Sequence, residues 1–368
     1  MNHTHPIYVL IVLMFYILLH YWYKPSRFYY SSNRRLKNII GGIIIILLCV
    51  FSVQDSDYFH YKEYISLLKS GHDISSLERV YIWIAEFVSY NYFLFRLLIW
   101  GGAYILFTQA AKRMHCDEGL VAFFFVSMYL SKFSYSRASL AMAIGIYGFS
   151  LIISSYKTRL IPSVCGVVLI FMTYFFHKSA VIFVPIYILS LFRWGKKGYF
   201  ILLLFLFALY LYFSKYGVDI LLSMEDNTIF DHKTAMSYLN KDKSNIGVAA
   251  LIQRVLERIP YYLILLIILR NVFWGKNDVE DYSMRCLMNF SFIVIVFSSL
   301  FLFDFGGNTS VIYYRLLYYS ILPLSILLSK LYTTGIDVKV VRTTQRIGYI
   351  SVLYAILYSA YNMYVLSF

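Results

Sequence analysis

The sequence predicts an all-α, polytopic integral membrane protein with about twelve transmembrane helices. Of the 368 residues, 60% are hydrophobic and only 14% are charged, and the mean hydropathy is +0.65. Soluble globular proteins do not reach this composition, because charged residues cover much of their surface. Apolar stretches long enough to cross a bilayer recur along the chain, and the expected spans are 7–23, 37–53, 92–111, 119–133, 138–153, 160–176, 179–193, 198–214, 259–274, 286–304, 311–331 and 347–366.

The basic residues predict how the chain threads through the membrane. The formal net charge is +14, but Lys and Arg are not gathered in one stripe, so no nucleic acid is expected as a partner. Nineteen of the 33 Lys and Arg lie in one alternating set of short loops, which the positive-inside rule places in the cytoplasm. One polytopic domain, residues 1–368, is therefore expected to have both termini and the long loops 54–91 and 215–258 on the outer side.

The first outer loop opens with a dense polar cluster. Asp57, His60 and Tyr61 follow the second span directly. A carboxylate or a histidine at a membrane mouth can act as a general base. The alternative is that these side chains are solvated and cap the next helix, because Asp is a favoured N-cap residue. Further on, Glu78 precedes Arg79–Ser89, which at about eleven residues fits an amphipathic interfacial helix better than a span.

The apolar runs at the centre of the chain are too long to be single spans. At 1.5 Å per residue, the run 119–153 would form a helix roughly 52 Å long, whereas the hydrocarbon core is about 30 Å thick. It must therefore turn near 132–137. The run 160–194 must turn in the same way, at His177 and Lys178.

These turns predict a helical hairpin of spans 138–153 and 160–176, with Arg137 and His177 at the same outer mouth. Ala141 and Gly145 are spaced four apart, so the helices are expected to approach closely. Ionisable residues at membrane depth normally pair or face a watery cavity, which makes this mouth the prime functional candidate. A histidine at a membrane boundary can also be purely structural.

Further arginines lie on the predicted outer side. Arg254 and Arg258 are four residues apart on one helical face, where two guanidiniums suit a phosphate-rich group. An ordinary solvated amphipathic helix is the competing interpretation. Arg315 lies about one turn inside the eleventh span. Arg96, early in the third span, is expected to reach the outer interface by snorkelling.

The four cysteines, at positions 49, 116, 165 and 286, have no CxxC spacing. Neither a disulfide framework nor a zinc site is supported. The stretch 115–118, His-Cys-Asp-Glu, is rich in potential ligands, but adjacent residues on one helical turn point in different directions. We therefore expect no metal site and no cofactor.

Four motifs follow one another along the chain: Asp57-Tyr58-x-x-Tyr61, Ser136-Arg137 with Leu140-Ala141-x-Ala143-Ile144, Phe176-His177-Lys178-Ser179-Ala180 with Pro185, and Arg315 with Tyr318-Tyr319. In this order they make the chain resemble the EpsG family of polytopic membrane proteins, which is related to the Wzy-type polymerases of O-antigen and capsular polysaccharide. The likeness extends over most of the chain. In the family the arginine at the position of Arg137 is often followed by Gln, whereas Ala138 follows it here.

The resemblance implies a metal-independent glycosyltransferase of GT-C-like architecture in the bacterial inner membrane. Such a polymerase joins undecaprenyl-diphosphate-linked glycans at the periplasmic face, so its implied partners are a lipid-linked donor, a lipid-linked acceptor, membrane lipids and a chain-length regulator protein. The product is an O-antigen, a capsule or an exopolysaccharide. The expected catalytic residues are Arg137, His177, Asp57, His60 and Glu78, and the expected substrate-binding residues are Arg254, Arg258, Arg315, Lys178 and Tyr61.

Three other functions are compatible with a protein of this kind. A flippase for lipid-linked oligosaccharides should show repeat symmetry between its halves, and no repeat is evident in the sequence. A membrane O-acetyltransferase needs a site for a cytoplasmic acyl donor, which the short cytoplasmic loops do not offer. A structural role in an export complex is the third alternative.

Overall fold

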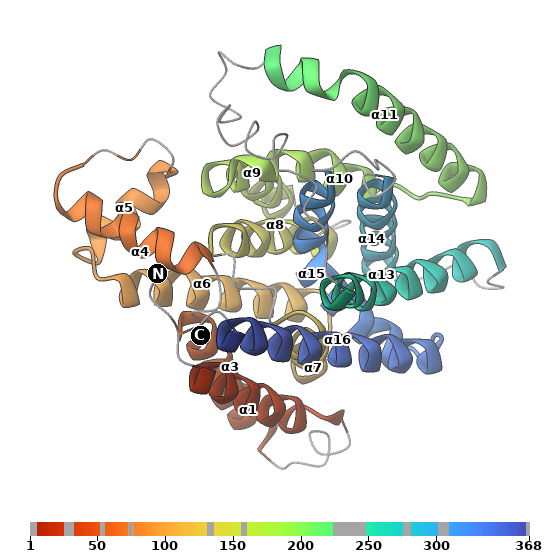
Figure 1. Ribbon diagram of the computed structural model, residues 1–368. Helices are drawn as coiled ribbons and strands as arrows, with labels where there is room; N and C mark the ends of the chain where they lie inside the picture. Colours follow the sequence, from red (N-terminus) through yellow and green to blue (C-terminus); the bar gives the residue numbers. More distant parts are fainter. Residues whose placement is uncertain are drawn as a thin grey trace.

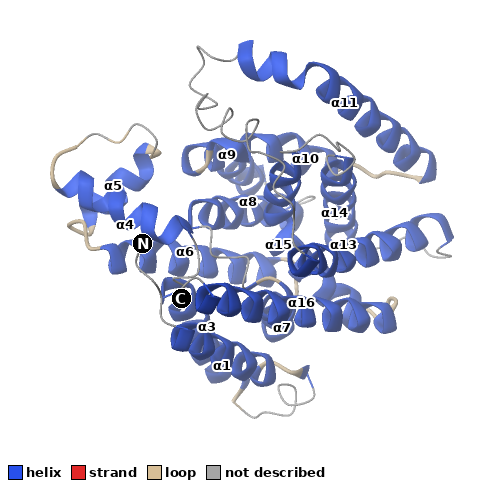
Figure 2. Cartoon of the chain, in the orientation of Figure 1, coloured by secondary structure: helices blue, strands red, loops and turns tan. Residues whose placement is uncertain are grey.

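The described part of the chain is built from helices. The computed structural model describes residues 6–25, 33–51, 56–72, 74, 77–130, 136–155, 160–223, 248–274, 281–300 and 309–365. No strand occurs among them (Figure 2), which confirms the all-α prediction. The helices are α1 Pro6–Trp22, α3 Arg34–Phe51, α4 Ser56–Lys69, α5 Arg79–Phe87, α6 Tyr92–Arg113, α7 Glu118–Met128, α8 Ser136–Ser155, α9 Leu160–Phe176, the 3-10 helix η2 Lys178–Ile182, α10 Phe183–Ser190, α11 Lys196–Ser223, α13 Val248–Trp274, α14 Tyr282–Leu300, α15 Thr309–Thr333 and α16 Val338–Val365.

Helical structure lies at each of the expected spans, but not every helix is long enough to cross a bilayer. Among the described residues, four helices have the length and apolar composition of a membrane span, and other apolar helices are shorter. The structure thus supports a membrane protein, while the number twelve stays a prediction. The four are Tyr92–Arg113, Ala138–Ser155, Tyr282–Ser299 and Leu316–Thr333.

Two of the expected spans are interrupted or short. The stretch expected to span 119–133 forms α7, which ends at Met128 and is roughly 16 Å long at 1.5 Å per residue. Every residue of α7 after Glu118 is buried, as expected for a helix that is apolar on all sides. The span expected at 179–193 is divided into η2 and α10, which together end at Ser190. Pro185 fits in the first turn of α10, where its missing N–H has no helical partner to lose.

The hairpin of α8 and α9 is the centre of the fold, and it packs through glycines. A Cβ atom on Gly148 would lie 2.7 Å from the carbonyl oxygen of Gly166, so only glycine permits this approach. A Cβ on Gly145 would meet the hydroxyl of Tyr187 on α10 at 2.9 Å. The close approach predicted from the small residues of α8 is therefore confirmed.

Other helices surround this hairpin in pairs. α6 packs against the face of α8 opposite α9, and α14 packs against α15, which also contacts α7 and α8. α16 packs against α13, α1 and α7 on the side of α6 away from the hairpin (Figure 1). α5 contacts both α6 and α9 and lies beside α4 (Figure 1), so it covers one end of the hairpin.

The two long loops predicted to lie on the outer side are partly helical. Arg79–Phe87 forms the short helix predicted there, with Tyr81 and Ala85 buried and Trp83 and Phe87 exposed on the other side. In the second loop, α11 continues to Ser223 and α13 begins at Val248. Residues 224–247 lie outside the described part of the chain.

Candidate functional site

The structure brings two of the predicted catalytic residues together. The Nδ1 atom of His177 lies 3.5 Å from the Oε1 atom of Glu78, at the outer limit for a hydrogen bond. The side chain of Glu78 is 9% exposed and that of His177 is 21% exposed. Glu78 is the N-cap residue of α5, yet its carboxylate makes no capping hydrogen bond to that helix. The carboxylate is therefore directed at the histidine.

His177 lies where the chain leaves α9. Its N–H still donates to the carbonyl of Thr173, but its φ and ψ angles of −161° and 112° are those of extended backbone. Its own carbonyl accepts from Ala180 in η2. A break between two apolar helices projects the imidazole from a helix end, and such breaks at membrane depth are tolerated where protein or a watery cavity surrounds them.

Aromatic rings hold this histidine and its partner in place. The ring of Tyr319 on α15 is nearly parallel to the imidazole of His177, with centroids 6.1 Å apart, and it stacks on Phe183 at 4.2 Å. On the glutamate side, Tyr81 of α5 is fully buried and contacts Phe176 of α9 edge-on. Four helical elements thus fix the pair.

The hairpin register places Arg137 level with His177. Gly148 of α8 is opposite Gly166 of α9. Arg137 is eleven residues before the first glycine and His177 is eleven residues after the second, a distance of roughly 16 Å along each helix. The backbone positions therefore agree with the predicted common mouth. The side chain of Arg137 lies outside the described residues.

The helix α15 brings a second predicted cation to this end of the hairpin. Arg315 is four residues before Tyr319, so the two positions share one face of α15. Because Tyr319 faces the His177 ring, Arg315 is located on the face of α15 that is directed toward the mouth, one turn nearer the N-terminus of the helix. The side chain of Arg315 is not among those described.

The residues after the second span form the helix α4. Asp57 is four residues before Tyr61, whose side chain is buried, so Asp57 lies on the face of α4 that meets the protein. Tyr61 contacts Tyr64 edge-on and packs in the core. Its role in substrate binding stays a prediction, and its buried ring does not lie at an open surface. The side chains of Asp57 and His60 fall outside the described residues.

The remaining predicted binding residues are spread over two elements. Lys178 is the first residue of η2 and is half-buried beside His177. Arg258 of α13 is also half-buried. Arg254 lies one turn before Arg258 in α13, and its side chain is outside the description.

Arg96 does not snorkel, contrary to the sequence-based expectation. Its side chain is only 2% exposed and donates hydrogen bonds to the carbonyls of Val50 at 2.9 Å and Cys49 at 2.6 Å. These carbonyls belong to the last turn of α3, which has no helical N–H groups left to bond them. Arg96 thus caps α3 and fixes the point from which the chain enters α4.

The predicted cytoplasmic end of the helices is closed by ion pairs. Four pairs of described residues lie there, and each links two elements or their adjoining residues: Arg34 with Asp117, Lys112 with Glu118, Arg270 with Asp337, and Lys330 with Asp281. Asp117 also caps α7 by accepting from the N–H of Leu120. Within the described part of the chain, the pair at the opposite end is His177 with Glu78.

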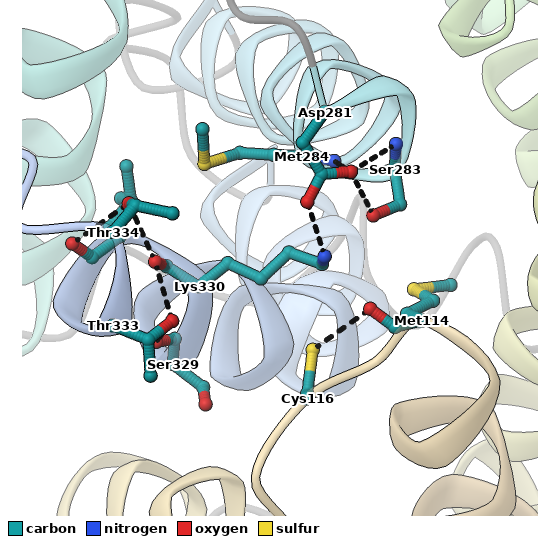
Figure 3. Close-up of polar contacts among 10 residues, drawn as sticks. Met114, Cys116, Asp281, Ser283, Met284, Ser329, Lys330, Thr333 and Thr334 are labelled. Carbon is teal, nitrogen blue, oxygen red and sulfur yellow. Dashed lines mark hydrogen bonds and ion pairs between the residues drawn. The ribbon is translucent and has the colours of Figure 1, made fainter.

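The most buried of these pairs joins α15 to the start of α14 (Figure 3). Lys330 donates from Nζ to Asp281 at 2.6 Å, while the same carboxylate accepts from the hydroxyl and the N–H of Ser283. Burial would raise the pKa of Asp281, but these hydrogen bonds outweigh it and hold the pKa below its ordinary value. Cys116 lies beside the pair, and burial raises the pKa of its thiol to about 12.

The geometry of His177 and Glu78 limits the chemistry that is possible at the mouth of the hairpin. With Nδ1 directed at Glu78, a neutral His177 keeps Nε2 as its basic nitrogen. The spacing of Glu78 and His177 in the sequence gave no signal of this pairing. The stacking partner Tyr319 was detectable only as one of two adjacent tyrosines one turn after Arg315.

The comparisons with known proteins gave one match. The model of the EpsG family matches residues 35–368, which is nearly the whole chain. No curated protein and no solved structure matches this chain.

Proposed function

We propose that this chain, which belongs to the EpsG family, polymerises undecaprenyl-diphosphate-linked oligosaccharide repeat units at the periplasmic face of the bacterial inner membrane. The family supports a polysaccharide polymerase-type role, and the helical structure supports a membrane location. The observation that carries the proposal is the pairing of Glu78 with His177 at the mouth of the α8 and α9 hairpin. The product would be an O-antigen, a capsule or an exopolysaccharide.

In the proposed reaction, His177 is the general base. Its Nε2 atom takes the proton from the attacking hydroxyl of the lipid-linked acceptor. The hydroxyl oxygen forms the new glycosidic bond to the anomeric carbon of the growing glycan. The bond from that carbon to undecaprenyl diphosphate breaks, and its electron pair leaves with the diphosphate. Glu78 orients the imidazole through Nδ1 and stabilises the positive charge that the ring acquires.

Arginines would stabilise the leaving diphosphate. Arg137 is level with His177 in the hairpin register, and Arg315 shares the face of α15 that carries Tyr319. A fixed guanidinium binds phosphate oxygens bidentately and stabilises charge that develops during bond breakage. We propose both as the cations for the diphosphate, with Arg254, Arg258 and Lys178 as further substrate contacts. The cations supplied by the protein make a metal-independent glycosyltransferase the appropriate class.

The distribution of ion pairs favours a polymerase over a flippase. A flippase must open its binding site to each side of the membrane in turn. Among the described residues at the predicted cytoplasmic end, three pairs link segments that are distant in the sequence and would resist such opening: Arg34 with Asp117, Arg270 with Asp337 and, most buried, Lys330 with Asp281. A site that serves one face only is what a periplasmic polymerase requires.

Glycan analysis of a deletion strain tests the proposal. Loss of a polymerase leaves single repeat units on the lipid or cell surface, because export continues without elongation. Loss of a flippase removes the surface glycan altogether. An acetyltransferase deletion would leave the chain length normal and remove acetyl groups. Plasmid-borne wild-type protein should restore the long chains, and any pattern other than single repeats contradicts the proposal.

A further inference from the structure

A groove lies between α13 and α16, at the end opposite the His177 mouth. It has a volume of about 840 Å³, within the range of roughly 300–1,000 Å³ typical of ligand sites. Its walls are apolar apart from Arg270 and Asp337, and include Leu263, Leu266 and Val340. The two helices contact each other.

The groove has the depth of one membrane leaflet. Its lining on α13 extends from Leu263 to Trp274, a rise of roughly 16 Å at 1.5 Å per residue. A hydrocarbon core of about 30 Å gives each leaflet about 15 Å. Trp274 is largely exposed at the end of α13, in the position of an interfacial aromatic anchor. The groove thus starts at the predicted cytoplasmic interface and ends near the bilayer centre.

Arg270 places a guanidinium at the end of this groove that lies near the predicted cytoplasmic interface. Arg270 donates from Nη1 to Asp337 at 2.8 Å, yet its side chain is 68% exposed. Asp337 is only 14% exposed and also accepts a longer contact of 3.4 Å from Asn271. The less exposed carboxylate of Asp337 therefore orients the more exposed guanidinium of Arg270. An arginine has five N–H donors, and this contact uses one terminal nitrogen.

We propose that this groove binds an anionic phospholipid of the cytoplasmic leaflet, with its acyl chains between α13 and α16 and its phosphate on Arg270. An apolar groove in a bilayer is filled by lipid tails, and the exposed guanidinium adds a preference for a negative headgroup. The glycan carrier is a poor candidate, because its diphosphate would be at the opposite face. The inference rests on the membrane placement in the proposed function but not on polymerase activity.

The test uses the purified full-length protein in nanodiscs or detergent, with phosphatidylglycerol and phosphatidylcholine as the two probes. Native mass spectrometry measures the apparent affinity for each lipid. We expect wild type to prefer phosphatidylglycerol, and Arg270→Gln to lose that preference by about fivefold, the effect of removing one basic residue near a headgroup. Arg342→Gln is the matched control, since Arg342 is on the same side but contacts Tyr332 instead of the groove.

A second variant distinguishes the contribution of the apolar groove to lipid binding from that of the Arg270 charge. Leu266 lines the groove and is largely exposed, and Leu266→Trp would place a bulkier ring in the space for the acyl chains, so binding of both lipids should fall together. The affinity of Arg270→Gln for phosphatidylcholine should equal that of wild type, which shows that the fold is intact. Equal affinity of wild type for the two lipids would overturn the proposal. So would an unchanged preference in Arg270→Gln, or an equal loss in Arg342→Gln.

Discussion

The imidazole of His177 and the carboxylate of Glu78 face each other across 3.5 Å, although they are 99 residues apart in the sequence. Each lies at the end of a helix, His177 after α9 and Glu78 before α5. Tyr81, one turn along α5, is buried against Phe176 and so holds the two helix ends together. The pair is thus a product of packing between an outer-loop helix and the central hairpin.

This pair gives the first prediction. His177→Ala should lower chain extension by about 10² to 10⁴-fold, the usual contribution of a general base. Glu78→Gln should cause a smaller loss, because the amide can still orient the ring but cannot stabilise its charge. Glu63→Gln, the same change at an exposed residue of α4, is the control. Polymer length and membrane abundance of each variant are measured together. A fully active His177→Ala would shift the role of base to Asp57 or His60.

The sequence was sufficient to predict where the helices lie and where the mouth of the hairpin is. Hydropathy and bilayer thickness predict a turn near His177, and the glycine register places Arg137 level with it. Glu78 was a candidate, but hydropathy does not reveal which distant helix end α5 will meet. Arg96 was misjudged for a similar reason. A cation near a span end is equally consistent with snorkelling and with capping, and only the packing of α3 beside α6 decides between them.

The early end of the helix expected at 119–133 could not be predicted either. Period and length distinguish a span from a loop, but the run 119–133 reads as a span whether it crosses the bilayer or stops inside it. α7 ends at Met128 in contact with α15 and α16, so its surroundings are protein. Burial on all sides is a property of the assembled fold.

The second prediction concerns the pair of Lys330 with Asp281 at the predicted cytoplasmic end. Asp281→Asn leaves the buried ammonium of Lys330 without its carboxylate. We expect the free energy of unfolding to fall by roughly 1.5–3 kcal/mol at pH 7, the range for hydrogen bonds to charged groups. Since folding lowers the pKa of Asp281, the stabilisation is complete above the unfolded pKa near 4 and is lost progressively as the pH falls from there through the lower folded pKa. Thermal unfolding in detergent at pH 7 and below pH 4 measures both.

The control for this pair is Lys339→Ala, which removes an exposed lysine of α16. It should leave the unfolding temperature of the protein nearly unchanged. If Asp281→Asn is as stable as wild type at pH 7, the pair does not hold α14 to α15. If Asp281→Asn is destabilised by the same amount at low pH, the ionised carboxylate is not the source of the stabilisation.

The third prediction tests the topology. The positive-inside rule places Lys197, at the start of α11, in the cytoplasm and Asp231 in the periplasm. Alkaline phosphatase is active only outside and green fluorescent protein only inside, so fusions at the two positions should give opposite signals. Equal signals would reject this arrangement of the termini and outer loops, and with it the periplasmic assignment of the His177 mouth.

The last prediction concerns Arg137, which the register of Gly148 and Gly166 places level with His177. If its guanidinium stabilises the leaving diphosphate, Arg137→Ala should lose chain extension at a cost of roughly 3–4 kcal/mol in the transition state, by analogy with one oxyanion donor. Arg137→Lys should restore only part of it, because a point charge replaces a bidentate fork. Arg79→Ala, at an exposed arginine of α5, should extend chains normally. A structural role would instead reduce membrane abundance in proportion to activity, and normal polymer from well-inserted Arg137→Ala protein would exclude the catalytic role.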